Sequence, residues 1–313
     1  MTVGTDDLAA RVEDAATPRP VPWGGSFARL RASTTLRRFV PAPVALAGLD
    51  LAVRASIRLR PERLARARAA MAAVVGGTPL EAELPVLAVR HLAAWPRAWE
   101  TAWRPWAVRR LPMEGLEGVR AVEPGRGVVF SRTHYGVPAG MASLPRSVGP
   151  IHLGVGGHLL SDAAPGYDGY QNEQTRRLLT RGGWRLVRAR GSHELFAEVL
   201  RSGGRVQLNL DVPGSTPVRF LGKTVEMAGG TARLAWDTDS VVVPAAVLRR
   251  GRGWVGHLDA PIDPRDHPTW ESLLQAVADV HSRLVLTAPE YLESPLRDGG
   301  WAVATGAGWR RAR

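Results

Sequence analysis

Between residues 113 and 300, short apolar segments alternate with segments of helical periodicity, and this alternation most limits the folds open to the chain. Apolar runs bounded by glycine predict strands that are covered on both faces. Because helical segments separate these strands, the pattern predicts an α/β fold whose central sheet is mostly parallel, with helices on both faces. The predicted strands are 127–131, 151–155, 184–189, 205–211, 218–222 and 240–248, and the predicted helices are 170–181, 193–201, 230–237 and 270–286.

A basic helical part is expected to precede this α/β body. Apolar residues between 44 and 75 recur at helical spacing among arginines, which predicts one amphipathic helix or two that meet near Pro61. A further helix is predicted over 84–111. Its tryptophans share one face, either as core or as a contact for a membrane or an acyl chain; they are Trp95, Trp99, Trp103 and Trp106.

Four regions follow from these patterns. Residues 1–43 are predicted to be a loose N-terminal tail and 44–112 the basic amphipathic helical part. Residues 113–300 are predicted to form the α/β domain, and 301–313 a basic C-terminal tail. The first residues have no apolar core of the kind found in signal peptides, and no segment has the ~18 consecutive apolar residues of a membrane span. We therefore expect a cytoplasmic protein, or one peripheral at the inner face of the cell membrane.

The charge and composition of the chain limit the classes of partner that it is expected to bind. The net charge is +12, and of the 41 basic residues all but Lys223 are arginine. Residues 54–110 alone hold 11 arginines and four acidic residues. The planar guanidinium group suits phosphate, so we expect a surface that faces a membrane, an acyl carrier, coenzyme A or RNA, and we expect no DNA. A helix that packs its apolar face on the body and leaves its arginines in water is the alternative. The absence of cysteine excludes disulfides, thiolate metal sites and cysteine nucleophiles.

Two polar residues follow predicted interior strands. His134 comes after GVVFSRT (127–133), and Gly136 and Pro138 then end the strand. Asp211 comes after the strand RVQLNL. Because sites in open α/β sheets are built at the carboxyl ends of strands, the two residues are a candidate base and its partner.

The order of several segments resembles the lipid A biosynthesis (lauroyl/myristoyl) acyltransferase family, which belongs to the lysophospholipid acyltransferase group and includes phosphatidylinositol mannoside acyltransferases. The resemblance covers roughly residues 50–292. It rests on GLEGV (115–119), GRGVVFSRTHYG (125–136), an Arg176-Arg177 pair before RGGWRLV, LRSGGRVQLNLD (200–211), VRFLG (218–222), GGTARLAWDTDSVVVP (229–244) and APEYL (288–292).

The resemblance implies transfer of an acyl group from a thioester, on coenzyme A or acyl carrier protein, to a hydroxyl or an amine. His134 matches the family's motif histidine and would be the general base, and Asp211 would orient it. No cofactor is implied. The expected substrate-binding residues are Arg132, Tyr135, Arg176, Arg177, Arg190 and Asn209. No metal is expected, because His152 and His158 lack a third ligand and helical spacing.

One departure from the family pattern bears on the mechanism. The family carries Asp or Glu five positions after the histidine, where this chain has Ala139. Asp211 could orient the histidine alone, the acceptor could be more reactive than a sugar or glycerol hydroxyl, or catalysis could have been lost. Two further hypotheses follow. One is a soluble enzyme of secondary metabolism that takes an acyl or aminoacyl group from a carrier protein or an aminoacyl-tRNA. The other is a non-catalytic lipid-binding or scaffold protein.

Overall fold

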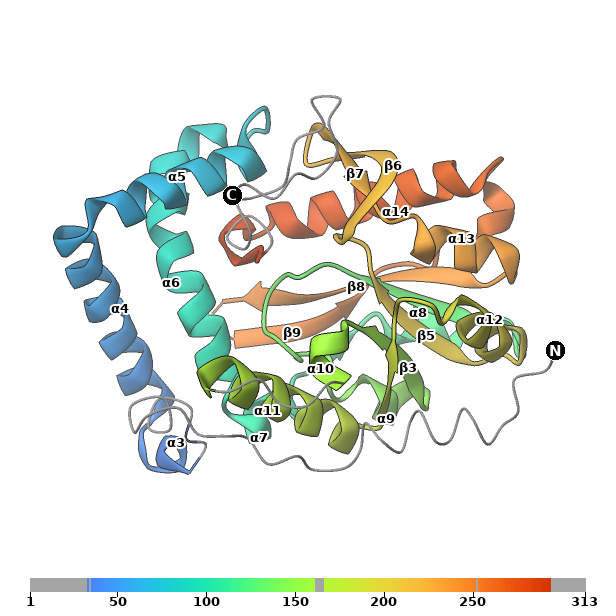
Figure 1. Cartoon of the computed structure of the whole chain (residues 1–313), viewed down its shortest axis with the longest axis horizontal. Helices are drawn as coiled ribbons and strands as arrows, with labels where there is room; N and C mark the ends of the chain where they lie inside the picture. Colours follow the sequence, from blue (N-terminus) through green and yellow to red (C-terminus); the bar gives the residue numbers. More distant parts are fainter. Residues whose placement is uncertain (1–32, 34, 161–165, 252, 294–313) are drawn as a thin grey trace.

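The computed structural model describes residues 33, 35–160, 166–251 and 253–293 (Figure 1). Its seven-stranded sheet has the order β1-β9-β8-β2-β5-β3-β4, and β6 and β7 form a separate pair. The strands are β1 (Met113–Glu114), β2 (Val128–Arg132), β3 (Ile151–Val155), β4 (Trp184–Arg188), β5 (Arg205–Asn209), β6 (Pro213–Phe220), β7 (Lys223–Met227), β8 (Val241–Arg250) and β9 (Gly253–Leu258). Neighbours in the large sheet are parallel except for β8 and β9. The prediction of a mostly parallel central sheet is confirmed.

Helices cover both faces of this sheet. They are α8 (Leu116–Arg120), α9 (Leu144–Val148), α10 (Gly157–Leu160), α11 (Gly166–Gly182), α12 (His193–Arg201), α13 (Gly230–Asp237) and α14 (Trp270–Leu286). Successive side chains of a strand point to opposite faces. On β2, Ser131 Oγ lies 3.0 Å from His281 Nε2 of α14, whereas Arg132 faces a cavity that Leu179 of α11 also lines.

The N-terminal part is helical, as predicted. Its helices are α3 (Leu36–Phe39), α4 (Ala42–Leu59), α5 (Pro61–Val75), α6 (Leu84–Ala102) and α7 (Pro105–Val108). Two helices meet at Pro61, rather than one continuing through it. Of the predicted tail 1–43, residues 36–39 form α3 and α4 begins at Ala42; the rest, except residues 33, 35, 40 and 41, lies outside the described residues, as does the predicted tail 301–313.

The predicted helix over 84–111 is interrupted. α6 ends at Ala102, and Arg104 leaves the helical region with φ −108° and ψ 78°. The ring of a proline clashes with the preceding residue in the α conformation, so Pro105 forces this break. The short helix α7 then begins at Pro105.

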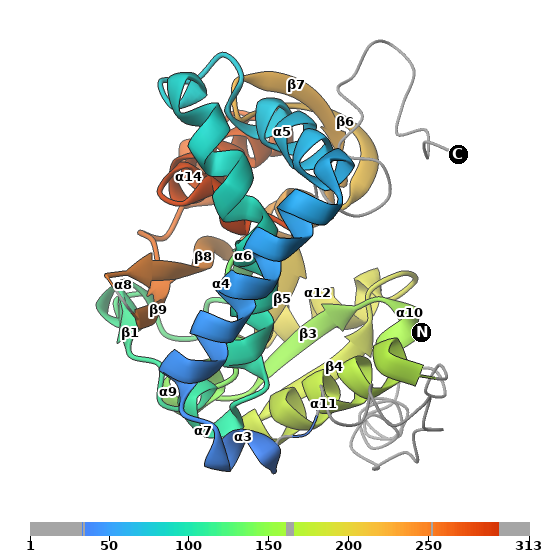
Figure 2. The ribbon, with the colours of Figure 1, turned by 90° about the vertical axis from the view of Figure 1, so that its left-hand side faces the viewer.

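The helix α6 connects the N-terminal part to the body. It contacts α4 and α5, and it also contacts η3 (Pro289–Tyr291) after α14. The apolar core is continuous across these elements, since Met71 of α5, Leu87 of α6 and Phe130 of β2 belong to one cluster. In Figure 2, α4 runs along the outside of the molecule over α6. No helix among the described residues is both long and apolar enough to cross a bilayer.

Candidate active site

The pairing of β2 with β5 brings His134 and Asp211 together. The strands are parallel with Arg132 opposite Asn209, and both residues of interest lie two positions further along their chains. Asp211 Oδ1 is 2.9 Å from His134 Nδ1, and Oδ2 accepts a hydrogen bond from the His134 backbone N–H at 2.7 Å. One carboxylate therefore holds both the imidazole ring and the backbone that carries it.

Burial differs between the two partners. The Asp211 side chain is 0% exposed, whereas that of His134 is 42% exposed. The negative charge of Asp211 raises the pKa of His134 to about 9 against the opposing effect of desolvation, and Glu293 adds to the rise while Arg132 opposes it. Imidazolium is thus favoured at neutral pH, and the ring must lose a proton before it can act as a base.

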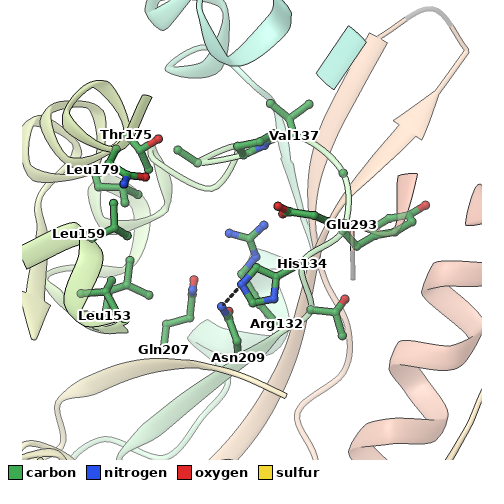
Figure 3. A pocket seen from close by; sticks show the side chains of 18 of the residues that line it. Arg132, His134, Val137, Leu153, Leu159, Thr175, Leu179, Gln207, Asn209 and Glu293 are labelled. Carbon is green, nitrogen blue, oxygen red and sulfur yellow. Dashed lines mark hydrogen bonds between the residues drawn. The ribbon is translucent and has the colours of Figure 1, made fainter. Parts of the chain in front are cut away.

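Asn209 contacts the other ring nitrogen of His134. Its Nδ2 lies 3.1 Å from His134 Nε2 (Figure 3). In this orientation the amide donates to Nε2 of a neutral ring whose Nδ1–H donates to Asp211. Rotated by half a turn, the same amide would accept a hydrogen bond from the imidazolium. Asn209 can therefore hold the ring in either protonation state.

The histidine faces a cavity of about 240 Å³. One end is polar, with Arg132, His134 and Asn209, and the other mixes apolar side chains with the polar side chains of α11 and β5, which are Gln171, Asn172, Thr175 and Gln207 (Figure 3). The apolar side chains that line it include Trp95, Trp99, Val137, Leu153, Val155, Leu159, Leu179 and Trp184. Such a division suits a ligand with a reactive polar group and an apolar or mixed extension.

Arg132 lies beside His134 in the polar end (Figure 3). Burial lowers the pKa of its guanidinium to about 10, and the charge of Asp211 opposes that change. The group therefore stays cationic at neutral pH. Its Nε atom has no hydrogen-bond partner among the described residues. A cation held in a largely desolvated site is well placed to stabilise an oxyanion that forms next to the histidine.

Glu293 joins the site from a distant part of the sequence. Its backbone N–H donates to the His134 carbonyl oxygen at 2.8 Å, and a β-bridge pairs Tyr135 with Leu292. Its side chain lines the cavity. The strand-end pattern did not indicate Glu293, since it follows η3 rather than a strand. Gln207 was also missed, because it stands inside a predicted strand.

Three predicted arginine contacts lie outside the cavity lining. Arg176 and Arg177 both pair with Glu173 of the same helix, through Arg176 Nε at 2.9 Å and Arg177 Nε at 2.5 Å. Arg190 lies exposed after β4. The spacing of Glu173 three and four residues before the arginines could have revealed these pairs.

Of Tyr135 and the tryptophans in and just after α6, some parts line the cavity and others are buried away from it. Tyr135 lines the cavity, but its hydroxyl is buried and lies 3.2 Å from Thr287 Oγ1. Trp95, Trp99 and Trp103 form a chain of ring contacts with centroid distances of 5.6 and 5.5 Å. Trp103 is core, whereas Trp95 and Trp99 line the cavity. The core interpretation is confirmed for Trp103, whereas for Trp95 and Trp99 a contact with an acyl chain stays a prediction.

Ala139 occupies the position of the missing acid. It lines the cavity in a left-handed backbone conformation, with φ 54°. Its side chain cannot orient an imidazole, and the carboxylate that contacts His134 is that of Asp211. Within the described part of the chain, no group of three or more His, Cys, Asp or Glu side chains could hold a metal ion.

The fold and site define an α/β protein with a histidine–aspartate pair at the carboxyl edge of a mostly parallel sheet. No protein-family model matches the chain, and no curated protein matches it significantly. Among solved structures it is similar to the 1-acyl-sn-glycerophosphate (LPA) acyltransferase PlsC from Thermotoga maritima, with 14% identity over 79% of this chain and 97% of that one, at a TM-score of 0.38. A likeness this weak carries no weight for the reaction, which must be inferred from the site.

Proposed function

We propose that the protein transfers an acyl group from a thioester, on coenzyme A or an acyl carrier protein, to a hydroxyl or an amine. One observation carries this proposal. The buried carboxylate of Asp211 forms hydrogen bonds with both the ring and the backbone of His134. That contact leaves His134 Nε2 toward the cavity, as a general base needs. It also supplies the orienting acid that Ala139 lacks.

The chemistry follows from three side chains. The acceptor displaces the Asn209 amide from Nε2 of neutral His134 and gives its proton to that nitrogen, and the acceptor's oxygen or nitrogen attacks the thioester carbonyl carbon. The tetrahedral intermediate carries a negative oxygen, which the Arg132 cation stabilises. Collapse breaks the carbon–sulfur bond, and the leaving thiolate takes the proton from the imidazolium. Asp211 stays ionised and supports the charged ring, so no covalent enzyme intermediate is needed.

We further propose that the protein works at an anionic membrane surface. The exposed side of α4 mixes apolar side chains with arginines, and its leucines include Leu51, which is 67% exposed, and Leu59, which is 81% exposed. Arg54 and Arg58 are exposed on the same helix, and its acidic residue, Asp50, is paired with Arg97. An exposed apolar stripe between arginines suits the headgroup layer of an anionic bilayer.

Release of free thiol from acyl-coenzyme A and acyl-pantetheine donors, with ethanolamine or glycerol as acceptor, tests the reaction. His134→Ala should abolish the release that depends on the acceptor. His193→Ala is the matched control, because His193 lies on α12 with a side chain 51% exposed and outside the cavity lining. Equal rates for the wild type and His134→Ala would contradict the role of His134 as base and favour a non-catalytic protein.

A further inference from the structure

Gln207 carries a buried amide oxygen that forms no hydrogen bond within the described part of the chain. It is 3% exposed, and its Oε1 has no partner among the described residues. Its neighbours across β2 and β3 are Phe130 and Leu153, which are apolar. Buried side-chain oxygens in folded proteins are nearly always hydrogen-bonded, so an exception calls for a functional or structural cause.

The strand register directs this amide at the candidate active site. Gln207 precedes Asn209 by two residues on β5, so both side chains project from the same face of the sheet. In Figure 3 the Gln207 side chain lies between Leu153 and Leu159 on one side and His134 on the other. Two residues of a strand span about 6.7 Å. Gln207 can therefore contact a group only a few bonds from a carbonyl placed at His134.

Other polar atoms of the same cavity also have no partner among the described residues. Both Trp99 and Trp184 line the cavity, and the Nε1 atom of each is buried and unpartnered. The hydroxyl of Thr133, at the polar end, is in the same state. The wall of the cavity thus holds polar groups at several points, and a plain alkyl chain offers none of them a hydrogen bond.

The volume of the cavity indicates which part of the thioester donor can occupy it. The cavity has a volume of about 240 Å³, which is small beside the carrier of a thioester and close to the roughly 300 Å³ at the lower end of drug-sized pockets. The acyl group is the part of the donor that can enter. Its carbonyl would lie at His134 and its chain would pass Gln207 toward Leu153.

We propose that the transferred acyl group is short and carries a polar substituent, a hydroxyl or an amine, which the Gln207 amide recognises; rotated by half a turn, this amide exchanges the positions of its oxygen and nitrogen. This proposal rests on the acyl-transfer function proposed above and names the class of acyl group. A site built to bond a substrate hydroxyl or amine discriminates strongly against an analogue without it. Gln207 would thus exclude unsubstituted fatty acyl groups.

Binding of three non-transferable probes tests the proposal. The probes are S-(2-oxoalkyl)-pantetheines of one chain length, either unsubstituted or with a hydroxyl or an amino group two carbons beyond the ketone. We expect the wild type to bind one substituted probe about 10- to 100-fold more tightly than the unsubstituted probe by calorimetry. The substituted probe that binds with the lower Kd tells whether the polar group of the acyl chain is a hydroxyl or an amine.

Two substitutions then assign the preference to Gln207. Gln207→Leu should remove it without lowering Tm, because it replaces an unsatisfied polar group with an apolar one of similar volume. Gln207→Met serves if the leucine variant does not fold. Gln275→Leu is the matched control, since Gln275 lies on α14 and bonds Arg219 outside the cavity lining. It should keep the preference.

Equal binding of all three probes by the wild type would overturn the proposal, as would a preference that survives in the Gln207 variants. The titration does not require turnover. A preference without acyl transfer would therefore support polar-chain recognition and contradict the proposed reaction. Transfer of unsubstituted acyl groups without any preference would support the reaction and overturn the role of Gln207.

Discussion

Helices α14 and α4 are of similar length, with 17 and 18 residues, but they have opposite surroundings. The helix α14 buries side chains along its length, from Leu273 to Val285, against the sheet and α13. The helix α4 has no buried residue. Apolar side chains of α14 therefore stabilise the fold, whereas those on the outer face of α4 add little to it. Apolar side chains thus have two kinds of surroundings in this chain, the core in α14 and exposed or half-buried positions in α4, where we propose that the exposed ones contact a membrane.

The largest expected effect lies in the body, at the carboxylate that holds the base. Asp211→Asn should lower acyl transfer about 10²- to 10⁴-fold, because the ring loses its orientation and the support for its cation. The charge of Asp211 raises the pKa of His134 to about 9, so the wild-type rate should climb with pH until about 9. In the variant the pH at which the rate rises should move down toward the ordinary histidine pKa near 6.5. A pH–rate profile measures both.

Membrane binding should be insensitive to that change, since it is assigned to α4. If the Asp211→Asn variant binds vesicles as the wild type does, acyl transfer and membrane binding depend on different parts of the molecule. An unchanged acidic limb in the variant would contradict the assignment of Asp211 as the partner of the base.

A matched pair of leucine truncations compares the two helices directly. Leu274→Ala in α14 removes a side chain that is 0% exposed, and it should lower the free energy of unfolding by about 2–5 kcal/mol. Leu51→Ala in α4 should change it by no more than about 0.5 kcal/mol. Urea unfolding measures both values. A large loss for Leu51→Ala would mean that its outer face is covered by the chain's own residues.

The smallest effect is expected for docking. Leu51→Asp with Leu59→Asp should weaken binding to phosphatidylglycerol vesicles at least tenfold, because burying a leucine side chain contributes about 1.5–3 kcal/mol. Cosedimentation measures the bound fraction. Trp236→Asp, an exposed apolar site on α13, is the control. Phosphatidylcholine vesicles should bind weakly in all cases, and equal binding to both lipids would contradict attraction by the arginines.

The sequence alone predicted where strands end better than which strands lie side by side in the sheet. His134 and Asp211 could be found because each follows an apolar run, and polar residues at such ends point to a site. Their contact could not be derived, since it depends on β2 lying beside β5, which no local pattern specifies. The predicted bounds of α14 were correct because its periodicity and its Thr269 cap agree.

The missed residues have physical reasons of their own. Gln207 carries no local signal beyond a polar residue in an apolar strand, and its lack of partners is a property of the folded chain. Glu293 reaches the site through a β-bridge between Tyr135 and Leu292. Arg176 was predicted to bind substrate from its charge alone, and in the fold its guanidinium pairs with Glu173.

The separation of the base from its acid affects how the protein becomes active during synthesis. A motif with both groups five residues apart could assemble as soon as one turn has formed. Here His134 and Asp211 are 77 residues apart, and β8 must also join β2 on its other edge. Domains fold as units as the chain leaves the ribosome. A nascent chain that ends before β8 would therefore hold His134 without the complete sheet that positions it against Asp211.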